Sequence, residues 1–179
     1  MKLILMRHGE SEANANNILQ GRENGKLTFK GAEQARKAGK ELKEKYKIDM
    51  VFCSPLTRAV ETLENILVED PIEGPVFMCK LLEERDFGEY SGVNEDDIDW
   101  KDIDEDNKVN KEMGVESLLE LLKRANLFLE DLKLEEDVST VLVVAHGELL
   151  KMIISILNGK RFEEKEFDNA EILVFEDFK

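Results

Sequence analysis

Residues 3–10 read LILMRHGE, and residues 141–148 read VLVVAHGE. In each stretch a short apolar run, typical of a strand buried on both faces, ends at a histidine that enters a Gly-Glu turn. The chain has only two histidines, His8 and His146, and these stretches contain both. Ligands bind at the carboxyl edge of an open α/β sheet. The pattern therefore predicts an α/β fold with both histidines at its ligand-binding edge.

Short apolar runs and amphipathic stretches alternate along the rest of the chain. The apolar runs predict further strands at 50–53, 76–82 and 172–175. The amphipathic patterns predict helices at about 30–46, 55–68, 116–132 and 147–158. Thr28 and Ser54 are the expected N-caps of the first two helices, Pro55 suits a first helical position, and Gly159 is expected to stop the last helix. The alternation predicts a three-layer α/β/α sandwich around a mostly parallel sheet.

The composition predicts one globular domain over residues 1–179. Hydrophobic residues make up 42% of the chain and charged residues 36%, and no Pro-rich or Ser/Gly-rich linker interrupts it. The strongest change in composition is EDDIDWKDIDED at 95–106, where eight of twelve residues are acidic. We interpret this stretch as part of an acidic surface insertion at about 89–113.

The net charge of −15 argues against a nucleic-acid partner, because binding a polyanion requires a basic face. No apolar run is long enough to span a membrane or to form the core of a signal peptide. Cys53 and Cys79 form no metal-binding or redox motif, which favours reduced thiols and a cytoplasmic location. The sequence sets no oligomeric state.

The residues around the two histidines suit phosphoryl transfer to and from a phosphorylated small molecule. Neutral imidazole is a good nucleophile, and Arg7 and Arg58 offer planar, permanently charged donors for phosphate oxygens. The helix that begins at Gly147 adds free N–H groups and a positive dipole end. A carboxylic acid must protonate the leaving oxygen, and Glu83 and Glu84 both follow the fourth predicted strand.

Several groups of residues, in order along the chain, resemble motifs of the histidine phosphatase superfamily, whose members are also called phosphoglycerate mutase-like. The matching residues are Arg7–Ser11 and Asn14; Gln20–Arg22, Leu27, Thr28, Gly31, Gln34 and Ala35; Ser54–Leu56, Arg58, Ala59 and Thr62; Leu82, Glu84, Gly88, Tyr90 and Gly92; Gly114, Glu116 and Ser117; and Ala145–Gly147. The resemblance covers nearly the whole chain and implies a phosphoglycerate mutase-like fold. It also implies chemistry that needs no metal and no diffusible cofactor.

The resemblance assigns roles to individual residues. His8 would be the phosphorylated histidine, and Arg7, Arg58 and His146 would complete the phosphate pocket. Glu84 would be the acid and base, with Glu83 as the competing assignment.

Further contacts follow from the same resemblance. Asn14 would be an outer phosphate contact, and Gln20, Gly21 and Arg22 would contact the substrate. The spacing of Leu82 and Gly88 around Glu84 matches the acid motif.

Members of the superfamily divide into mutases and phosphatases, and the sequence favours a phosphatase. Glu84-Arg85 resembles the mutase sequence, but acidic residues follow Gly92 where a mutase would carry a basic residue. The size and spacing resemble the small phosphatases, including α-ribazole phosphatase and broad-specificity phosphatases. Phosphoglycerate mutase-type transfer and phosphoprotein hydrolysis are the competing activities.

The sequence also permits a calcium site or a catalytically inactive binding module, and both are disfavoured. Asp102, Asp104 and Asp106 alternate as in an EF-hand loop, but Asn107 stands where glycine is needed and Met113 where the bidentate glutamate belongs. A solvated acidic loop is the favoured interpretation. A binding module is disfavoured because every residue that the chemistry needs is present.

Overall fold

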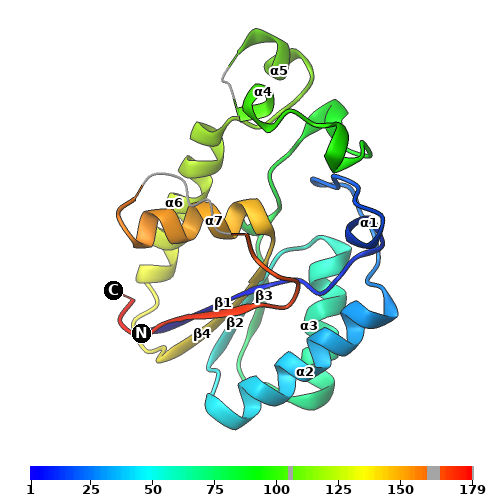
Figure 1. Ribbon diagram of the computed structural model, residues 1–179. Helices are drawn as coiled ribbons and strands as arrows, with labels where there is room; N and C mark the ends of the chain where they lie inside the picture. Colours follow the sequence, from blue (N-terminus) through cyan, green and yellow to red (C-terminus); the bar gives the residue numbers. More distant parts are fainter. Residues whose placement is uncertain (105–106, 161–165, 179) are drawn as a thin grey trace.

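The computed structural model describes residues 1–104, 107–160 and 166–178. Its strands form one sheet in the order β3-β2-β4-β1-β5 (Figure 1). The strands are β1 (Lys2–Arg7), β2 (Met50–Cys53), β3 (Val76–Met78), β4 (Thr140–Ala145) and β5 (Ile172–Phe175). All neighbouring pairs are parallel except β1 with β5, which is antiparallel. The prediction of a mostly parallel sheet is therefore confirmed.

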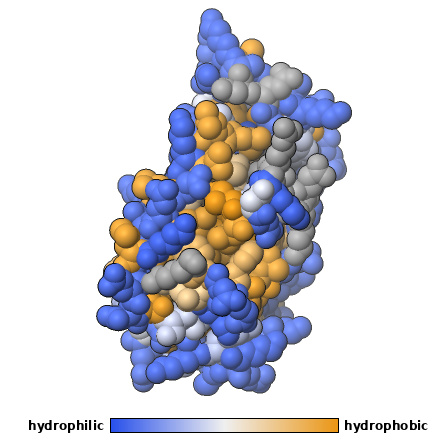
Figure 2. Space-filling model, turned by 90° about the vertical axis from the view of Figure 1, so that its left-hand side faces the viewer, coloured by the Kyte–Doolittle hydropathy of each residue, from blue (hydrophilic) through white to orange (hydrophobic). Residues whose placement is uncertain are grey.

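Two helices cover each face of the sheet (Figure 1). Because successive strand residues point to opposite faces, Leu3 and Leu5 pack with one pair of helices, and Ile4 and Met6 pack with the other pair. The first pair is α6 (Leu118–Lys133) and α7 (Gly147–Leu157), and the second is α2 (Phe29–Lys45) and α3 (Thr57–Glu69). The three-layer α/β/α sandwich is confirmed. On the α6 and α7 side, Figure 2 shows a band of apolar residues bordered by hydrophilic ones.

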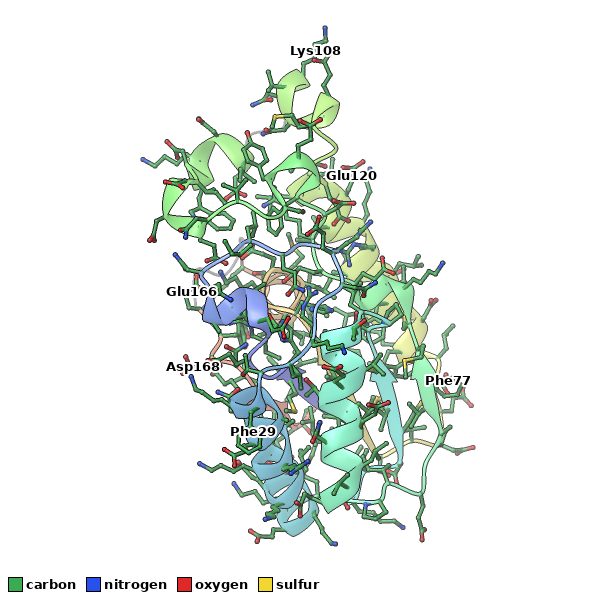
Figure 3. The ribbon with its side chains drawn as sticks, turned by 90° about the vertical axis from the view of Figure 1, so that its right-hand side faces the viewer. Phe29, Phe77, Lys108, Glu120, Glu166 and Asp168 are labelled. Carbon is green, nitrogen blue, oxygen red and sulfur yellow. The ribbon has the colours of Figure 1, made fainter. Side chains whose placement is uncertain are left out.

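Short elements form the part of the molecule beyond the carboxyl ends of the strands. They are α1 (Glu12–Ala15), α4 (Trp100–Asp104), α5 (Lys108–Glu112) and 3-10 helices at Lys80–Leu82, Gly88–Tyr90 and Glu95–Asp97. Figures 1 and 3 show α4 and α5 at the end of the molecule opposite α2. Leu19, Phe87, Ile103 and Val115 form a small core here, separate from the cores on the sheet. Ile103 of the acidic segment is thus packed against apolar residues from other parts of the chain.

Two expectations about element boundaries were wrong. The strand predicted at 76–82 ends at Met78, and the chain turns into a 3-10 helix that places Leu82 in the core beneath α6 and α7. The helix predicted from Pro55 begins at Thr57, with Leu56 as its N-cap. Ser54 does not cap the helix: its buried hydroxyl accepts the N–H of Leu56, which precedes the helix, and lies 2.7 Å from Nε2 of His146.

The remaining boundaries agree with the sequence patterns. Thr28 caps α2 by accepting a hydrogen bond from the Gly31 N–H, and Gly159 follows the end of α7 with a φ of +61°. Within the described residues, no helix combines the length and the hydrophobicity that a membrane span requires.

Candidate active site

The two histidines meet because their strands are neighbours. β1 and β4 are paired in parallel register, with Arg7 opposite Ala145, so the residues that follow both strands emerge together. The His8 and His146 ring centroids are 5.1 Å apart. Both rings are buried, with relative exposures of 3% and 0%. The shared Gly-Glu turns therefore mark one location in the fold.

The hydrogen bonds of His8 identify the ring nitrogen that carries a lone pair. Nδ1 lies 2.7 Å from the carbonyl oxygen of Gly9. Since a carbonyl only accepts hydrogen bonds, Nδ1 must carry a proton. Burial lowers the pKa of His8 well below its ordinary value, and the charges of Arg58 and Arg7 lower it further. The ring is therefore neutral, and its lone pair is on Nε2, which accepts a hydrogen bond from Arg58 Nε at 3.2 Å.

Arg58 is held in place by a loop that precedes it in the chain. Its terminal nitrogens donate to the carbonyl oxygens of Gly21 at 2.7 Å and Glu23 at 2.9 Å. Gly21 presents that carbonyl with a φ of +55°, a conformation that favours glycine. Burial, together with the charge of Arg7, lowers the pKa of Arg58 to about 10, so the guanidinium stays charged at neutral pH.

Arg7 and His146 each have a buried nitrogen without a partner. Arg7 donates from Nη1 to the carbonyl oxygen of Phe167, but its Nε has no hydrogen bond. His146 uses Nε2 with Ser54, and its Nδ1 has no hydrogen bond. In the described part of the chain, these are the only two buried side-chain nitrogen or oxygen atoms left unpaired. Buried polar atoms nearly always have partners, so this site lacks an acceptor that a ligand can supply.

Glu84 lies across from these groups at the N-terminal end of α7. It is 8% exposed. Its Oε1 accepts the backbone N–H groups of Arg85 at 2.9 Å and Leu149 at 3.2 Å, and its Oε2 accepts that of Glu148 at 3.3 Å. A Cβ added to Gly147 would lie 3.8 Å from Arg7 Nε and 3.9 Å from Glu84 Oε2. Gly147 therefore keeps open the space between the arginine and the carboxylate.

A cavity of about 610 Å³ joins most of the predicted site residues. It is lined by Arg7, His8, Asn14, Gln20, Gly21, Arg58, Glu84 and Gly147, all of them predicted from the sequence. The side-chain oxygen of Asn14 accepts from Ser11 N and Asn169 Nδ2. That arrangement leaves the side-chain N–H groups of Asn14 available to the cavity.

Three of the candidate residues do not line the cavity. His146 is fully buried beside His8. Glu83 lies 3.6 Å from Arg22 in an ion pair. Arg22, expected as a substrate contact, also pairs with Asp86 and Glu116. Arg22 is paired with these carboxylates and is not among the residues that line the cavity, so its expected contact with the substrate stays a prediction.

Comparison with known proteins identifies the family. The model of the histidine phosphatase superfamily, branch 1, matches residues 3–177. The chain belongs to this superfamily.

Relatives in the superfamily carry names from both of its activity classes. The chain is 37% identical over 172 residues to a 2,3-bisphosphoglycerate-dependent phosphoglycerate mutase of Mesorhizobium japonicum, covering 90% of this chain and 84% of the relative. Among solved structures, the α-ribazole phosphatase of Shigella flexneri has a TM-score of 0.81 and 26% identity. The phosphoserine phosphatase of Entamoeba histolytica, in complex with 3-phosphoglyceric acid, has a TM-score of 0.80 and 29% identity. Each covers 97% of this chain and 89% of the neighbour.

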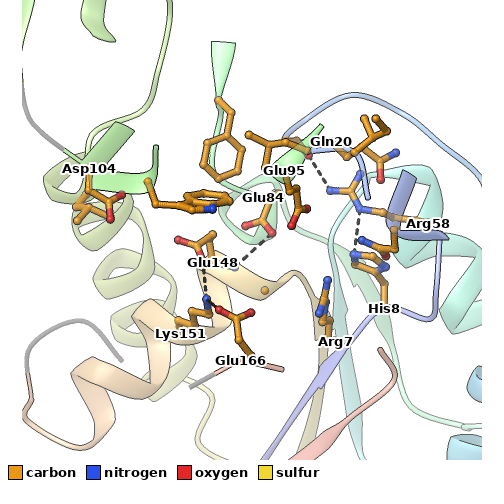
Figure 4. Close-up of a pocket in the computed structure, with 18 residues that line it drawn as sticks. Arg7, His8, Gln20, Arg58, Glu84, Glu95, Asp104, Glu148, Lys151 and Glu166 are labelled. Carbon is orange, nitrogen blue, oxygen red and sulfur yellow. Dashed lines mark hydrogen bonds and ion pairs between the residues drawn. The ribbon is translucent and has the colours of Figure 1, made fainter. Parts of the chain in front are cut away.

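In this member of the superfamily, the cavity has two ends of different charge. Figure 4 shows Arg7, His8 and Arg58 on one side of the cavity. We call these residues, together with His146 buried beside His8, the histidine end. Asp104, Glu148, Lys151 and Glu166 lie on the other side, which we call the acidic end. Glu84 and Glu95 lie between the two ends.

The residues of the acidic end were not predicted as a group from the sequence. Lys151 Nζ lies 2.9 Å from Glu148 Oε1 and 2.8 Å from Glu166 Oε1, so its charge is already balanced. Asp104, one of the alternating aspartates, pairs with Arg85 at 2.5 Å, and Asp106 lies outside the described residues. The i, i+3 spacing of Glu148 and Lys151 just after the AHG motif was the available signal.

Trp100 and Phe87 add an apolar wall to the same cavity. Their rings pack edge to face, with centroids 5.8 Å apart, and Trp100 remains 37% exposed. Ile18, Leu19 and Leu118 also line the cavity. The space beside Glu84 is therefore partly apolar and partly acidic.

Proposed function

We propose that the protein hydrolyses small-molecule phosphate monoesters through a phosphohistidine on His8. The observation that carries the proposal is the pair of unsatisfied nitrogens, Arg7 Nε and His146 Nδ1, beside a neutral His8 with an unprotonated Nε2. A phosphoryl group seated there would supply acceptor oxygens to both nitrogens and to Arg58. Its phosphorus would then face the lone pair of Nε2.

In the first step, His8 Nε2 forms a bond to phosphorus as the bond between phosphorus and the ester oxygen breaks. The electron pair of that bond goes to the leaving oxygen, and the Glu84 carboxyl group supplies its proton. The guanidinium groups of Arg7 and Arg58 stabilise the charge on the equatorial oxygens. Glu84 suits the acid role better than Glu83, because Glu84 lines the cavity and Glu83 pairs with Arg22.

In the second step, water attacks the phosphohistidine. The Glu84 carboxylate takes a proton from this water, and the electron pair of the N–P bond returns to His8 Nε2. Burial of His8 supports both steps, since it keeps the ring neutral before attack and neutral after release. The products are inorganic phosphate and an alcohol.

Mutase activity is the second candidate, because the curated relatives are named phosphoglycerate mutases. A mutase must hold a second anionic group at the far end of its substrate. Here the far end carries Asp104, Glu148 and Glu166, and its Lys151 is already paired with two of them. This balance of charge supports hydrolysis over transfer between two phosphates of one substrate.

A small-molecule substrate fits the cavity better than a phosphoprotein. The volume of about 610 Å³ lies within the range of ligand pockets, roughly 300–1,000 Å³. The proposed nucleophile is also only 3% exposed. A folded protein surface would have difficulty reaching it.

Hydrolysis of a panel of phosphate monoesters in the presence of a chelator tests the proposal. The wild type is expected to release inorganic phosphate, and His8→Ala is expected to lower kcat by at least about 10³-fold. Wild-type enzyme quenched in base or in denaturing detergent should carry a base-stable, acid-labile phosphoryl group that His8→Ala lacks. Transfer between phosphoglycerates without phosphate release would instead establish a mutase. Activity that survives His8→Ala would contradict the phosphohistidine.

A further inference from the structure

The segment that carries Glu84, residues 83–87, has no strand or regular helix to hold it, and we call it the acid segment. Residues 83–87 run between the 3-10 helices Lys80–Leu82 and Gly88–Tyr90. Backbone groups in such a segment need partners from elsewhere, because buried polar atoms without partners are costly. Side chains from two other parts of the chain provide these partners.

Arg124 of α6 holds the segment by three successive contacts. Its Nη1 donates to the carbonyl oxygens of Leu81 at 2.9 Å and Glu83 at 2.6 Å, and its Nη2 donates to that of Glu84 at 3.0 Å. The remaining donors form a bidentate pair with Glu116, at 2.6 Å from Nε and 2.8 Å from Nη2. A planar guanidinium can satisfy all these acceptors at once, whereas the ammonium of lysine cannot.

Glu116 and Arg22 complete the arrangement. Glu116 Oε2 accepts the backbone N–H of Asp86 at 3.2 Å, and the Glu116 N–H donates to the Asp86 carbonyl oxygen at 2.8 Å. Arg22 donates from Nε to the Glu84 carbonyl oxygen at 3.1 Å and pairs with Glu116 at 3.2 Å. The Glu84 carbonyl oxygen therefore accepts from two arginines.

The contacts on the two sides of Glu84 have different origins. Its carboxylate accepts backbone N–H groups at the start of α7, while its backbone carbonyl is held by Arg124 and Arg22. The Glu84 carboxylate can keep a single position relative to Arg7 and Gly147 only if the backbone of Glu84 is itself held in place. The side chains of Arg124 and Glu116 are 12% and 10% exposed, so water does little to replace these contacts.

We propose that Arg124 is a positioning residue for Glu84, with Arg22 and Glu116 as its partners. The inference rests on the proposed acid role of Glu84. Arg124 does not reach the cavity lining, so it acts through the backbone of the acid segment. Loss of Arg124 should move the carboxyl group away from the leaving oxygen while leaving His8, Arg7 and Arg58 in place.

The test compares two esters that differ in their need for an acid. Dinitrophenolate leaves without a proton, whereas the alkoxide of phenylethyl phosphate needs one. With kcat/KM as the readout, only the steps up to phosphohistidine formation are compared. Glu84→Gln should lower kcat/KM for phenylethyl phosphate by about 10²–10⁴-fold, and it should lower kcat/KM for dinitrophenyl phosphate far less.

Arg124→Gln should reproduce this selective loss. Its kcat/KM should fall by about 10²-fold for phenylethyl phosphate and stay within about threefold of the wild-type value for dinitrophenyl phosphate. Arg124→Lys should have a kcat/KM for phenylethyl phosphate between those of Arg124→Gln and the wild type. Arg22→Gln should also lower this kcat/KM, but by less than Arg124→Gln does. Lys123→Gln is the matched control, since it removes an exposed charge from the adjacent position of α6 and should match wild type on both esters. Melting curves show whether each variant folds. If Arg124→Gln does not fold, the kcat/KM values of Arg22→Gln and Arg124→Lys on the two esters test the positioning role.

The positioning role would be overturned if Arg124→Gln lowered kcat/KM equally for both esters, or did not lower kcat/KM for phenylethyl phosphate. Failure of the wild type to cleave either ester would instead overturn the proposed function. A selective fall in Glu84→Gln with none in the arginine variants would keep the acid and reject the positioning residue.

Discussion

The two ends of the cavity differ in how they are built. The histidine end is assembled from residues at strand ends and the first turns of helices, with His8 after β1, His146 after β4 and Arg58 in α3. The acidic end is assembled from α4, the first two turns of α7 and the segment before β5. Parallel strand pairing therefore fixes the histidine end, whereas the acidic end depends on local insertions and loops.

The two ends also differ in what their charges can still bind. At the histidine end, Arg7 Nε and His146 Nδ1 have no partner. At the acidic end, Lys151 and Asp104 are already paired. Positive charge in this cavity is therefore available to an anion at one end only.

The largest expected contrast comes from removing one cation from each end. Arg7→Gln should lower kcat/KM for propyl phosphate by about 10²–10³-fold, because it removes charge and donors aimed at the transferring phosphoryl group. Lys151→Gln should lower it far less, by no more than about threefold, because Lys151 binds two carboxylates of the protein itself. Steady-state kinetics check both values, with the exposed Arg36→Gln as a control for loss of positive charge. Equal losses at Arg7 and Lys151 would erase the distinction between the ends.

Much of the histidine end could be predicted from the sequence, because its signals are local. The apolar runs before His8 and His146 determine both the strands and where they end, and parallel pairing then brings the two residues together. Gly21 was expected near the substrate, and the structure gives a more specific reason for a glycine there. Its positive φ presents the carbonyl that holds Arg58.

The acidic end and the acid segment could not be predicted, because their contacts join residues from separate elements. Glu166, before β5, meets Lys151 of α7, and Arg22 meets Glu116 from a loop far away in the sequence. One feature of the sequence did indicate that Arg124 has a structural role. It lies three residues after Leu121 and four before Phe128, on the buried face of α6, where a charged residue needs a buried partner.

Acid should destabilise the fold through the histidine end. Burial lowers the pKa of His8 and His146 well below 6.5, so as pH falls below that value the unfolded chain takes up protons that the folded chain does not. The free energy of unfolding should then fall by about 1.4 kcal/mol per pH unit for each histidine. Urea unfolding between about pH 5.5 and 7 measures this slope, and His146→Asn should reduce it by about half.

The acidic end should respond to pH with the opposite sign. Burial raises the pKa of Glu148, so above 4.5 the unfolded chain releases a proton that the folded chain retains, and stability falls as pH rises through that range. Glu148→Gln removes this contribution and should make the increase of stability with pH steeper. The assignment of opposite signs would be contradicted if the free energy of unfolding had the same pH dependence in Glu148→Gln as in the wild type above about pH 4.5, and the same in His146→Asn as in the wild type between about pH 5.5 and 7.

The smallest expected effect concerns the group at the far end of the substrate. Aminoethyl phosphate, propyl phosphate and the phosphate ester of 3-hydroxypropanoate share the same chain length and differ in a terminal ammonium, methyl or carboxylate group. The carboxylate ester should have a kcat/KM about tenfold below that of propyl phosphate, because its charge approaches Glu95 and the acidic end. Glu95 suits this role, since it lines the cavity between the two ends.

Glu95→Gln should bring the carboxylate ester closer to propyl phosphate, to within about threefold, while Glu64→Gln, an exposed change of the same charge on α3, should leave the tenfold gap intact. High salt should narrow the gap in the wild type, because screening weakens charge repulsion across a solvent-filled cavity. The opposite result would be that both the wild type and Glu95→Gln prefer the carboxylate ester to propyl phosphate. That result would mean that Lys151 releases Glu148 and Glu166 and binds the substrate instead. The acidic end would then be a second anion site, as a mutase requires.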